Sequence, residues 1–397
     1  GKKQENKLAY WRYNMRTVEI IGKFFDNHSL SIINRKLAFE LAKRDDIDLY
    51  INALDTYDSQ YNVASADIKE LKKLMREIPQ EPDIQIRHSY PPIWRWPVSE
   101  KTKILQIQPW EYRKVPFEWQ YKFETFVDLV ITPSQWTGKV FAEAGLNPHK
   151  VAIIPNGYST KHFNTRSRKP NEEKYQFVFV GCAQWRKGLD VLLQAWSGIF
   201  KKEDPVKLVI KDNPAVYGDA NVLPQLIKLQ YDTGCAEIEY IGKQVSEIDM
   251  SRLYKSSHCI VHPYRGEGFG MHIQEAMACG CFPLVSGDGP TTEFVKDAES
   301  TIKTNHILVN ASDSNVMMMK PGDALTTMGG HAVASQPDVQ DLALRMKEAF
   351  TQRKEGRDYT NDLFTWENVA ERYAGVINSI DLDEQAIRLQ TQGWRAT

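Results

Sequence analysis

The chain has 397 residues, 42% of them hydrophobic, which is enough to build more than one hydrophobic core. Its 50 basic and 51 acidic side chains nearly cancel, so composition provides no general electrostatic attraction to nucleic acid or lipid. No apolar run reaches the roughly 18 residues that a membrane-spanning helix needs, and residues 1–16 lack the apolar segment of a secretion signal. Five cysteines without a disulfide-type spacing predict reduced thiols and a cytoplasmic location.

In the first half of the chain, short β-rich apolar runs alternate with stretches of helical periodicity. Strands are predicted at 17–22, 48–54, 83–89, 103–109 and 129–134, and helices at 31–44, 118–127 and 135–145. Such alternation is typical of a parallel sheet with helices on both faces. The sequence therefore predicts one α/β domain over residues 1–170.

A polar stretch without periodicity follows, and it is the predicted linker, with the domain boundary near 164–175. A second α/β series then begins. Strands are predicted at 177–181, 207–212, 238–242 and 259–264, and helices at 188–200, 221–232, 250–257, 272–280 and 364–380. We predict a second domain over 171–380, an irregular surface loop at 300–336, and a segment at 381–397 that crosses back to the first domain.

The most informative stretch is "RGEGFG" at 265–270, a predicted loop between a strand and a helix. Its three glycines allow the backbone to approach a ligand closely. The helix is expected to begin near Met271 or His272, and its N-terminus offers unpaired N–H groups and a partial positive charge. This combination predicts a phosphate-binding site.

Two acids flank that turn. Glu275 falls in the first turns of the helix, where its carboxylate can accept hydrogen bonds from a ribose diol, and Glu267 lies toward the other end of such a ligand. Arg186 and Lys187 follow a strand of the same sheet and can offset the charge of a diphosphate. The plainer interpretation is a tight glycine turn with a solvated Glu267 and with Glu275 supporting the helix.

Taken together, these segments resemble the retaining, nucleotide-sugar-dependent glycosyltransferases of the GT-B fold, specifically the large fourth family. The resemblance rests on a Glu, seven residues, Glu motif within 267–294, the strand and helix at 181–196, and the segments 130–163 and 238–264. It implies an α/β fold of two Rossmann-like doubly wound domains facing across a cleft. It also implies that Glu275 binds the ribose, that Lys187 binds the phosphates, and that Glu267 lies beside the transferred sugar. The donor diphosphate and sugar would then meet the backbone of Gly268, Phe269, Gly270, Met271 and His272.

The chain departs from the family pattern in three places. Cys182 stands where the family usually has an arginine, and Arg186 is the candidate substitute. The turn after the first strand, usually glycine-rich, keeps only Gly22. Where a histidine commonly follows a later strand of the first domain, this chain has Glu111, which either takes a polar role near the sugar or caps the next segment.

Two further candidates come from strand ends. His88 ends a predicted strand of the first domain and is a catalytic candidate, since a strand end should face the ligand. Lys211 ends a strand of the second domain and is a candidate for contacts to the nucleotide base.

The resemblance implies retaining transfer of a hexose from a UDP- or GDP-sugar to a hydroxyl acceptor, with no metal and no cofactor besides the donor. Neither Asp-x-Asp stretch, at 46–48 and 381–383, lies on a predicted strand end where a nucleotide-bound metal would be held. The acceptor can be a glycan, a lipid-linked molecule, a protein or another hydroxyl compound. The sequence gives no clear signal for nucleic-acid binding and predicts no transmembrane segment. Peripheral contact with a membrane is left open. Two alternatives stay open: a nucleotide-sugar epimerase on the same fold and a non-catalytic nucleotide-sugar binding protein.

Overall fold

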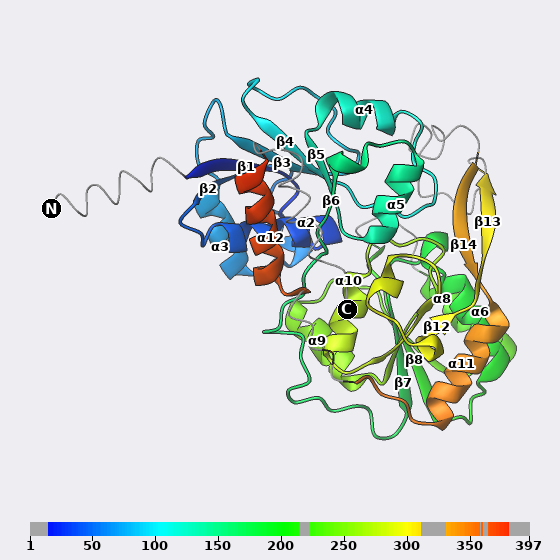
Figure 1. The fold of residues 1–397 in the computed structure, drawn as a ribbon. Helices are drawn as coiled ribbons and strands as arrows, with labels where there is room; N and C mark the ends of the chain where they lie inside the picture. Colours follow the sequence, from blue (N-terminus) through cyan, green and yellow to red (C-terminus); the bar gives the residue numbers. More distant parts are fainter. Residues whose placement is uncertain (1–14, 215–221, 311–330, 358, 360–363, 381–397) are drawn as a thin grey trace. The chain divides into compact units, whose positions relative to one another are not determined.

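The structure is a computed structural model that describes residues 15–214, 222–310, 331–357, 359 and 364–380 (Figure 1). Internal contacts divide the chain into two compact units. The first unit comprises residues 1–109, 118–157 and 362–397, and the second comprises 110–117 and 158–361. This division differs from the predicted boundaries, because the second unit begins at Tyr158 and also includes the short segment 110–117.

The first unit is built on a parallel six-stranded sheet with the strand order β2-β1-β3-β4-β5-β6. Its strands are β1 (Arg16–Gly22), β2 (Ile47–Ala53), β3 (Ile84–His88), β4 (Lys103–Ile107), β5 (Leu129–Thr132) and β6 (Val151–Ile153). The accompanying helices are α2 (Ser29–Leu41), α3 (Ser65–Leu74), α4 (Trp119–Phe126), α5 (Gln135–Glu143) and α12 (Trp366–Ser379). The five predicted strands and three predicted helices of this region are confirmed, and α3 and β6 are additions.

The last described helix, α12, belongs to the first unit and packs against α2 (Figure 1). Asn378 donates a hydrogen bond to Asp46 at 2.9 Å, and Glu371 forms an ion pair with Arg44 at 2.5 Å. The apolar face of α12 is thus buried against a helix of the first unit. The predicted second domain, residues 171–380, had included this helix. Helical periodicity shows that a helix has a face to bury, but it does not name the partner.

The second unit contains another parallel six-stranded sheet, with the order β12-β11-β10-β7-β8-β9. Its strands are β7 (Tyr175–Val180), β8 (Val206–Lys211), β9 (Glu237–Ile241), β10 (Cys259–His262), β11 (Phe282–Ser286) and β12 (Thr301–Ile302). Its helices are α6 (Leu189–Ile199), α8 (Leu223–Thr233), α9 (Glu247–Ser256), α10 (Met271–Ala278) and α11 (Val339–Thr351). Numbered within the unit, this is the doubly wound order 3-2-1-4-5-6, whose strand order reverses between β7 and β10.

The prediction of an irregular loop at 300–336 is wrong at both of its ends. Strands β13 (Thr304–Asn310) and β14 (His331–Pro337) pair antiparallel over their full lengths, and β12 joins the edge of the second sheet. Pairing with a partner strand supplies the backbone hydrogen bonds of each strand, and the local sequence does not predict this pairing. The remainder of the predicted loop, 311–330, and the predicted crossing segment 381–397 lie outside the described residues.

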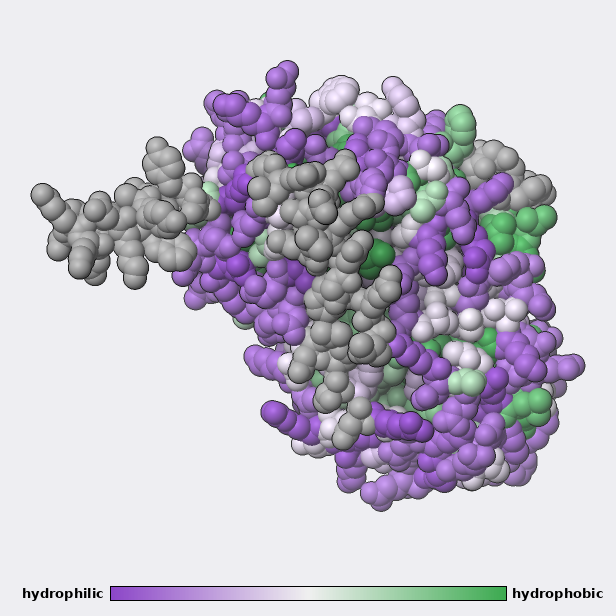
Figure 2. All heavy atoms as spheres, viewed as in Figure 1, coloured by the Kyte–Doolittle hydropathy of each residue, from purple (hydrophilic) through white to green (hydrophobic). Residues whose placement is uncertain are grey.

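The surface shown in Figure 2 is mainly hydrophilic, and its hydrophobic residues gather in small separate groups. In the described part of the chain, no helix is both long enough and apolar enough to cross a membrane. All five cysteines are buried and no disulfide joins them, which agrees with the predicted reduced thiols.

Candidate active site

The carboxyl ends of β7 and β10 carry the two loops that build the candidate site, at the point where the strand order of the second sheet reverses. Ligands of open α/β sheets bind at such a switch point. The two loops touch through Gly188, which has φ +73°, since an added Cβ there would lie 1.8 Å from the Pro263 carbonyl oxygen. A glycine is therefore required for Arg186 to approach the second loop, where its guanidinium donates to the Gly266 carbonyl at 2.8 Å.

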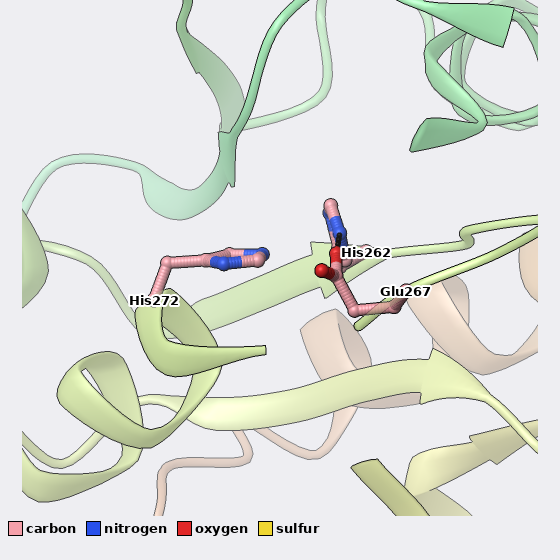
Figure 3. Close-up of side chains that lie close together, drawn as sticks. All are labelled: His262, Glu267 and His272. Carbon is pink, nitrogen blue, oxygen red and sulfur yellow. Dashed lines mark hydrogen bonds and ion pairs between the residues drawn. The ribbon is translucent and has the colours of Figure 1, made fainter. Parts of the chain in front are cut away.

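Glu267 is the centre of this site (Figure 3). One carboxylate oxygen, Oε2, accepts from Lys187 Nζ at 2.6 Å and lies 3.0 Å from His262 Nε2. The other, Oε1, accepts from the backbone N–H of Gly268 at 3.1 Å. With only 8% of its surface exposed, Glu267 is a buried carboxylate held by a cation and two further donors.

These contacts keep Glu267 charged, whereas burial keeps its histidine neighbours neutral. Burial by itself would raise the pKa of the Glu267 carboxyl, but the Lys187 ammonium and the His262 hydrogen bond outweigh it and hold the pKa well below its usual range. Burial lowers the pKa of His262 to about 4. It also lowers the pKa of His272 well below its usual value, with the neighbouring His262 adding to the effect. Near pH 7 the His262–Glu267 contact is therefore a hydrogen bond from a neutral imidazole rather than an ion pair.

The start of α10 follows directly. Gly270, its N-cap residue, has φ +98° and provides no side-chain cap. An added Cβ at Gly270 would lie 2.8 Å from Thr291 Cγ2, so the close packing there also requires glycine. The first N–H groups of the helix, at Met271 and His272, have no helical carbonyl to bond to. Phe269 is buried and packs on Phe294 with ring centroids 5.4 Å apart, and this contact holds the loop in place.

Glu275 lies one turn further along α10 and is partly exposed. The hydroxyl of Tyr254, which is itself buried, donates to Glu275 Oε2 at 3.4 Å. This contact joins α9 to α10 beside the site.

Glu111 reaches the site from the segment 110–117. Its carboxylate lies 3.8 Å from Arg186 Nη2, and its carbonyl oxygen would be 2.5 Å from a Cβ at Gly266. Arg113 anchors the same segment through a bidentate contact to Asp288, which follows β11. The structure thus brings Glu111, Arg186, Lys187 and Glu267 into one network. Glu111 contacts Arg186, and Lys187, the next residue in the chain, contacts Glu267.

His88 and Lys211 are not part of that network. His88 ends β3 in the first unit, is 1% exposed, and its Nδ1 lies 2.8 Å from Asn34 Oδ1. Burial lowers the pKa of His88 to about 3, and the nearby His28 contributes to this shift. Lys211 is 6% exposed, donates to the Asp212 carbonyl at 2.6 Å, and has a pKa lowered by burial.

Sequence reasoning missed His262. The signal was present, because His262 ends β10 as His88 ends β3, and strand ends point toward the ligand side of a sheet. Its contact with Glu267 could not be read from the sequence, since the intervening turn decides where each side chain points.

The second unit also has an open hollow of about 420 Å³ between α9 and the segment 161–169. It is lined by Lys161, His162, Ser167, Lys169, Ile248, Ser251, Arg252, Lys255 and Ser256. It contains none of the predicted site residues and no carboxylate, so we place the candidate site at the switch point instead.

Two protein families match the chain in adjoining regions. Glycosyl transferases group 1 matches residues 160–317, and Glycosyltransferase Family 4 matches residues 64–162. The crystal structure of the Anabaena protein HepE in complex with UDP-glucose has a similar fold, with a TM-score of 0.56 and 15% sequence identity over 95% of this chain and 98% of that chain. The architecture is thus that of the GT-B glycosyltransferases.

Curated relatives match parts of the chain. The lipopolysaccharide 1,2-N-acetylglucosaminetransferase of Salmonella typhimurium is 25% identical over 258 residues, which are 62% of this chain and 60% of that protein. The phosphatidylinositol N-acetylglucosaminyltransferase gpi3 subunit of Schizosaccharomyces pombe is 24% identical over 152 residues, which are 38% of this chain and 32% of that protein. The chain therefore spans less than two thirds of the length of these relatives. The chain therefore has the GT-B fold, and two of its regions match glycosyltransferase family models.

Proposed function

We propose that the chain is a retaining, metal-independent glycosyltransferase that transfers a hexose from a UDP- or GDP-sugar to a hydroxyl acceptor. The observation that carries this proposal is the Lys187–Glu267 pair at the switch point of the second sheet, beside an uncapped helix start lined by glycine. The HepE structure was solved with UDP-glucose, which supports a nucleotide-sugar donor for this fold.

The donor diphosphate would bind the backbone of Gly268 to His272. The helix start supplies N–H groups and a partial positive charge, and Phe269 keeps the loop in place. Glu275 would accept hydrogen bonds from the ribose hydroxyls. Lys211, at the end of β8, is the proposed residue beside the base, and its ammonium donates to the Asp212 carbonyl.

Transfer breaks the bond between the sugar's anomeric carbon and the diphosphate oxygen, and the bonding electrons leave with the diphosphate. The acceptor oxygen forms the new bond to the same carbon, and its proton passes to the leaving diphosphate oxygen. Stabilising the charge on the leaving diphosphate is then the main task. Lys187 suits it, since an ammonium has three N–H donors and only one is used by Glu267. Arg186 would support the same charge from the Gly266 side.

Glu267 and Glu111 would act beside the transferred sugar, where charged acceptors can hold its hydroxyls. His88 is the proposed contribution of the first unit. Its Nδ1 is bonded to Asn34, while its buried Nε2 has no hydrogen-bond partner among the described residues. The acceptor would be a glycan, a lipid-linked molecule or a protein hydroxyl, and we propose a cytoplasmic location.

The direct test combines nucleotide binding with product analysis. UDP or GDP should raise the thermal unfolding temperature, because a ligand that binds only the folded state stabilises it. Glu275→Ala should weaken that nucleotide by roughly 10–100-fold, given about 1.5–3 kcal/mol per hydrogen bond to a charged group. Glu173→Gln, on the exposed surface of the same unit, is the matched control.

The products then separate the candidate functions. Transfer with retained anomeric configuration that persists in a strong chelator supports the proposal. Conversion of the donor sugar without any acceptor would instead indicate an epimerase. Binding without turnover, across a broad set of acceptors, would indicate a binding protein.

A further inference from the structure

Three side chains of the second unit converge beside the start of α10. They are His262 at the end of β10, Glu267 in the following loop, and His272 in the first turn of α10. One potential ligand atom from each lies within 4.8 Å of the other two. Figure 3 shows the His272 ring directed toward His262 and the Glu267 carboxylate, and the two imidazole rings meet edge to face with centroids 4.3 Å apart.

Two imidazoles and one carboxylate make a ligand set that borderline divalent metals such as Zn²⁺ prefer. A tetrahedral ion with bonds of about 2.0–2.1 Å holds its ligand atoms roughly 3.4 Å apart. His262 Nε2 and Glu267 Oε2 are already 3.0 Å apart, so only the His272 ring has to move inward. As the partly exposed member of the three, it is the one with room to do so.

His262 Nε2 donates to Glu267 in the ion-free protein, so for Nε2 to bind the ion its proton must move to Nδ1. Among the described residues, neither His262 Nδ1 nor His272 Nε2 has a hydrogen-bond partner, although both atoms are buried. A buried polar atom without a partner is uncommon and calls for an explanation such as an ion or a water molecule.

Lys187 opposes the ion. Its ammonium lies 2.6 Å from Glu267 Oε2 and would repel a divalent cation. A carboxylate oxygen has two lone pairs, so Glu267 Oε2 can face the ion only beside this ammonium, while Oε1 accepts the backbone N–H of Gly268. Removing the lysine charge should therefore tighten metal binding, which no general loss of structure would do.

We propose that His262, Glu267 and His272 bind a borderline divalent transition-metal ion, and that this ion excludes the nucleotide-sugar and inhibits transfer. The exclusion rests on the function proposed above, whereas the metal site does not. Transfer itself still needs no metal. Mg²⁺ and Ca²⁺ should not occupy the site, because they favour shells of oxygen ligands.

The binding test uses the full chain without a polyhistidine tag or nucleotide, titrated with Co²⁺ and followed by visible absorption. We expect saturable binding of one ion per chain that Zn²⁺ displaces and Mg²⁺ does not. His272→Ala should abolish it, Glu267→Gln should weaken it, and Lys187→Met should tighten it. His149→Ala, in the first unit, is the control that should change nothing.

Absence of saturable binding, or binding that survives His272→Ala, overturns the site. Should His272→Ala fail to fold, the opposite responses of Glu267→Gln and Lys187→Met still decide the matter, and weaker binding in Lys187→Met counts against the site. For the exclusion, Zn²⁺ should inhibit wild-type transfer more than that of His272→Ala in identical mixtures. Chelation of Zn²⁺ by the donor diphosphate is the same in the wild-type and His272→Ala mixtures. Equal inhibition of the two proteins would therefore overturn the proposal that the bound ion excludes the nucleotide-sugar.

Discussion

The switch points of the two sheets can be compared directly. In the first unit, β1 and β3 end at Gly22 and His88, and the Asn34 side chain fills the space above them. A Cβ at Gly22 would lie 2.4 Å from Asn34 Nδ2. In the second unit, β7 and β10 end beside the charged pair of Lys187 and Glu267.

The helix starts differ in the same way. The N-terminus of α2 is capped, because the His28 side chain accepts from the Leu30 N–H at 3.3 Å. The N-terminus of α10 begins at Gly270 without a side-chain cap. Helix starts beside the switch points of two similar sheets can therefore be either closed by neutral hydrogen bonds or left ready for an anion. Only the second arrangement suits a diphosphate.

The largest expected effect comes from removing the charge at the centre of the second switch point. Glu267→Ala should lower transfer by roughly 10²–10³-fold, similar to the loss of one preorganised charge-stabilising group elsewhere. Glu267→Gln keeps the size of the side chain and should still lose most of the activity, since Lys187 and His262 then face an amide. Kinetic constants for donor and acceptor check this, and full activity in Glu267→Gln would contradict the proposed role.

Backbone packing between the two loops gives the next effect. Gly188→Ala places a methyl group against the Pro263 carbonyl in a left-handed conformation and should cost roughly 2–4 kcal/mol of unfolding free energy. Gly198→Ala is the matched control, since a Cβ at that helical position meets nothing within 4 Å. Gly198→Ala should be neutral or stabilise by about 0.5–1 kcal/mol. Urea unfolding of both variants measures the difference, and equal stabilities would refute the packing argument.

Ligand affinity should separate the two switch points. Lys187→Met should weaken UDP or GDP by roughly 10–100-fold, the value of one charge-assisted hydrogen bond. Asn34→Ala should leave nucleotide affinity unchanged but lower stability, because it removes the partner of His88 and a bond to the Lys23 carbonyl. Calorimetric titration tests both variants. If Asn34→Ala weakened nucleotide binding and Lys187→Met did not, the nucleotide would have to be assigned to the first unit instead.

Acidification should affect both units together. Burial lowers the pKa of His88 to about 3 and those of His258 and His262 to about 4, against 6.5 for an ordinary histidine. Between pH 6.5 and about 4 the unfolded chain therefore binds protons that the native chain does not. Stability is complete above pH 6.5 and falls as the pH drops, by up to about 1.4 kcal/mol per pH unit for each histidine. Urea midpoints at both ends of this interval check the trend, and a constant midpoint would exclude it.

Much of the fold could be predicted because most of the parallel strands bury both faces and appear in the sequence as short apolar runs. Helix α10 was expected near Met271 and begins there. The hairpin of β13 and β14 was missed, since its pairing depends on a partner strand. The site prediction named Lys187 and Glu267, but their mutual contact was not foreseen.

By itself, the sequence determined the alternation of strands and helices, the glycine-lined turn and the set of charged residues around it. These are local properties, fixed by side-chain periodicity and backbone freedom. Only the tertiary structure decided that α12 joins the first unit, that segment 110–117 brings Glu111 to Arg186, and that His262 holds Glu267. Such contacts join residues far apart in the chain or across a turn, and their geometry follows from packing rather than from any local pattern.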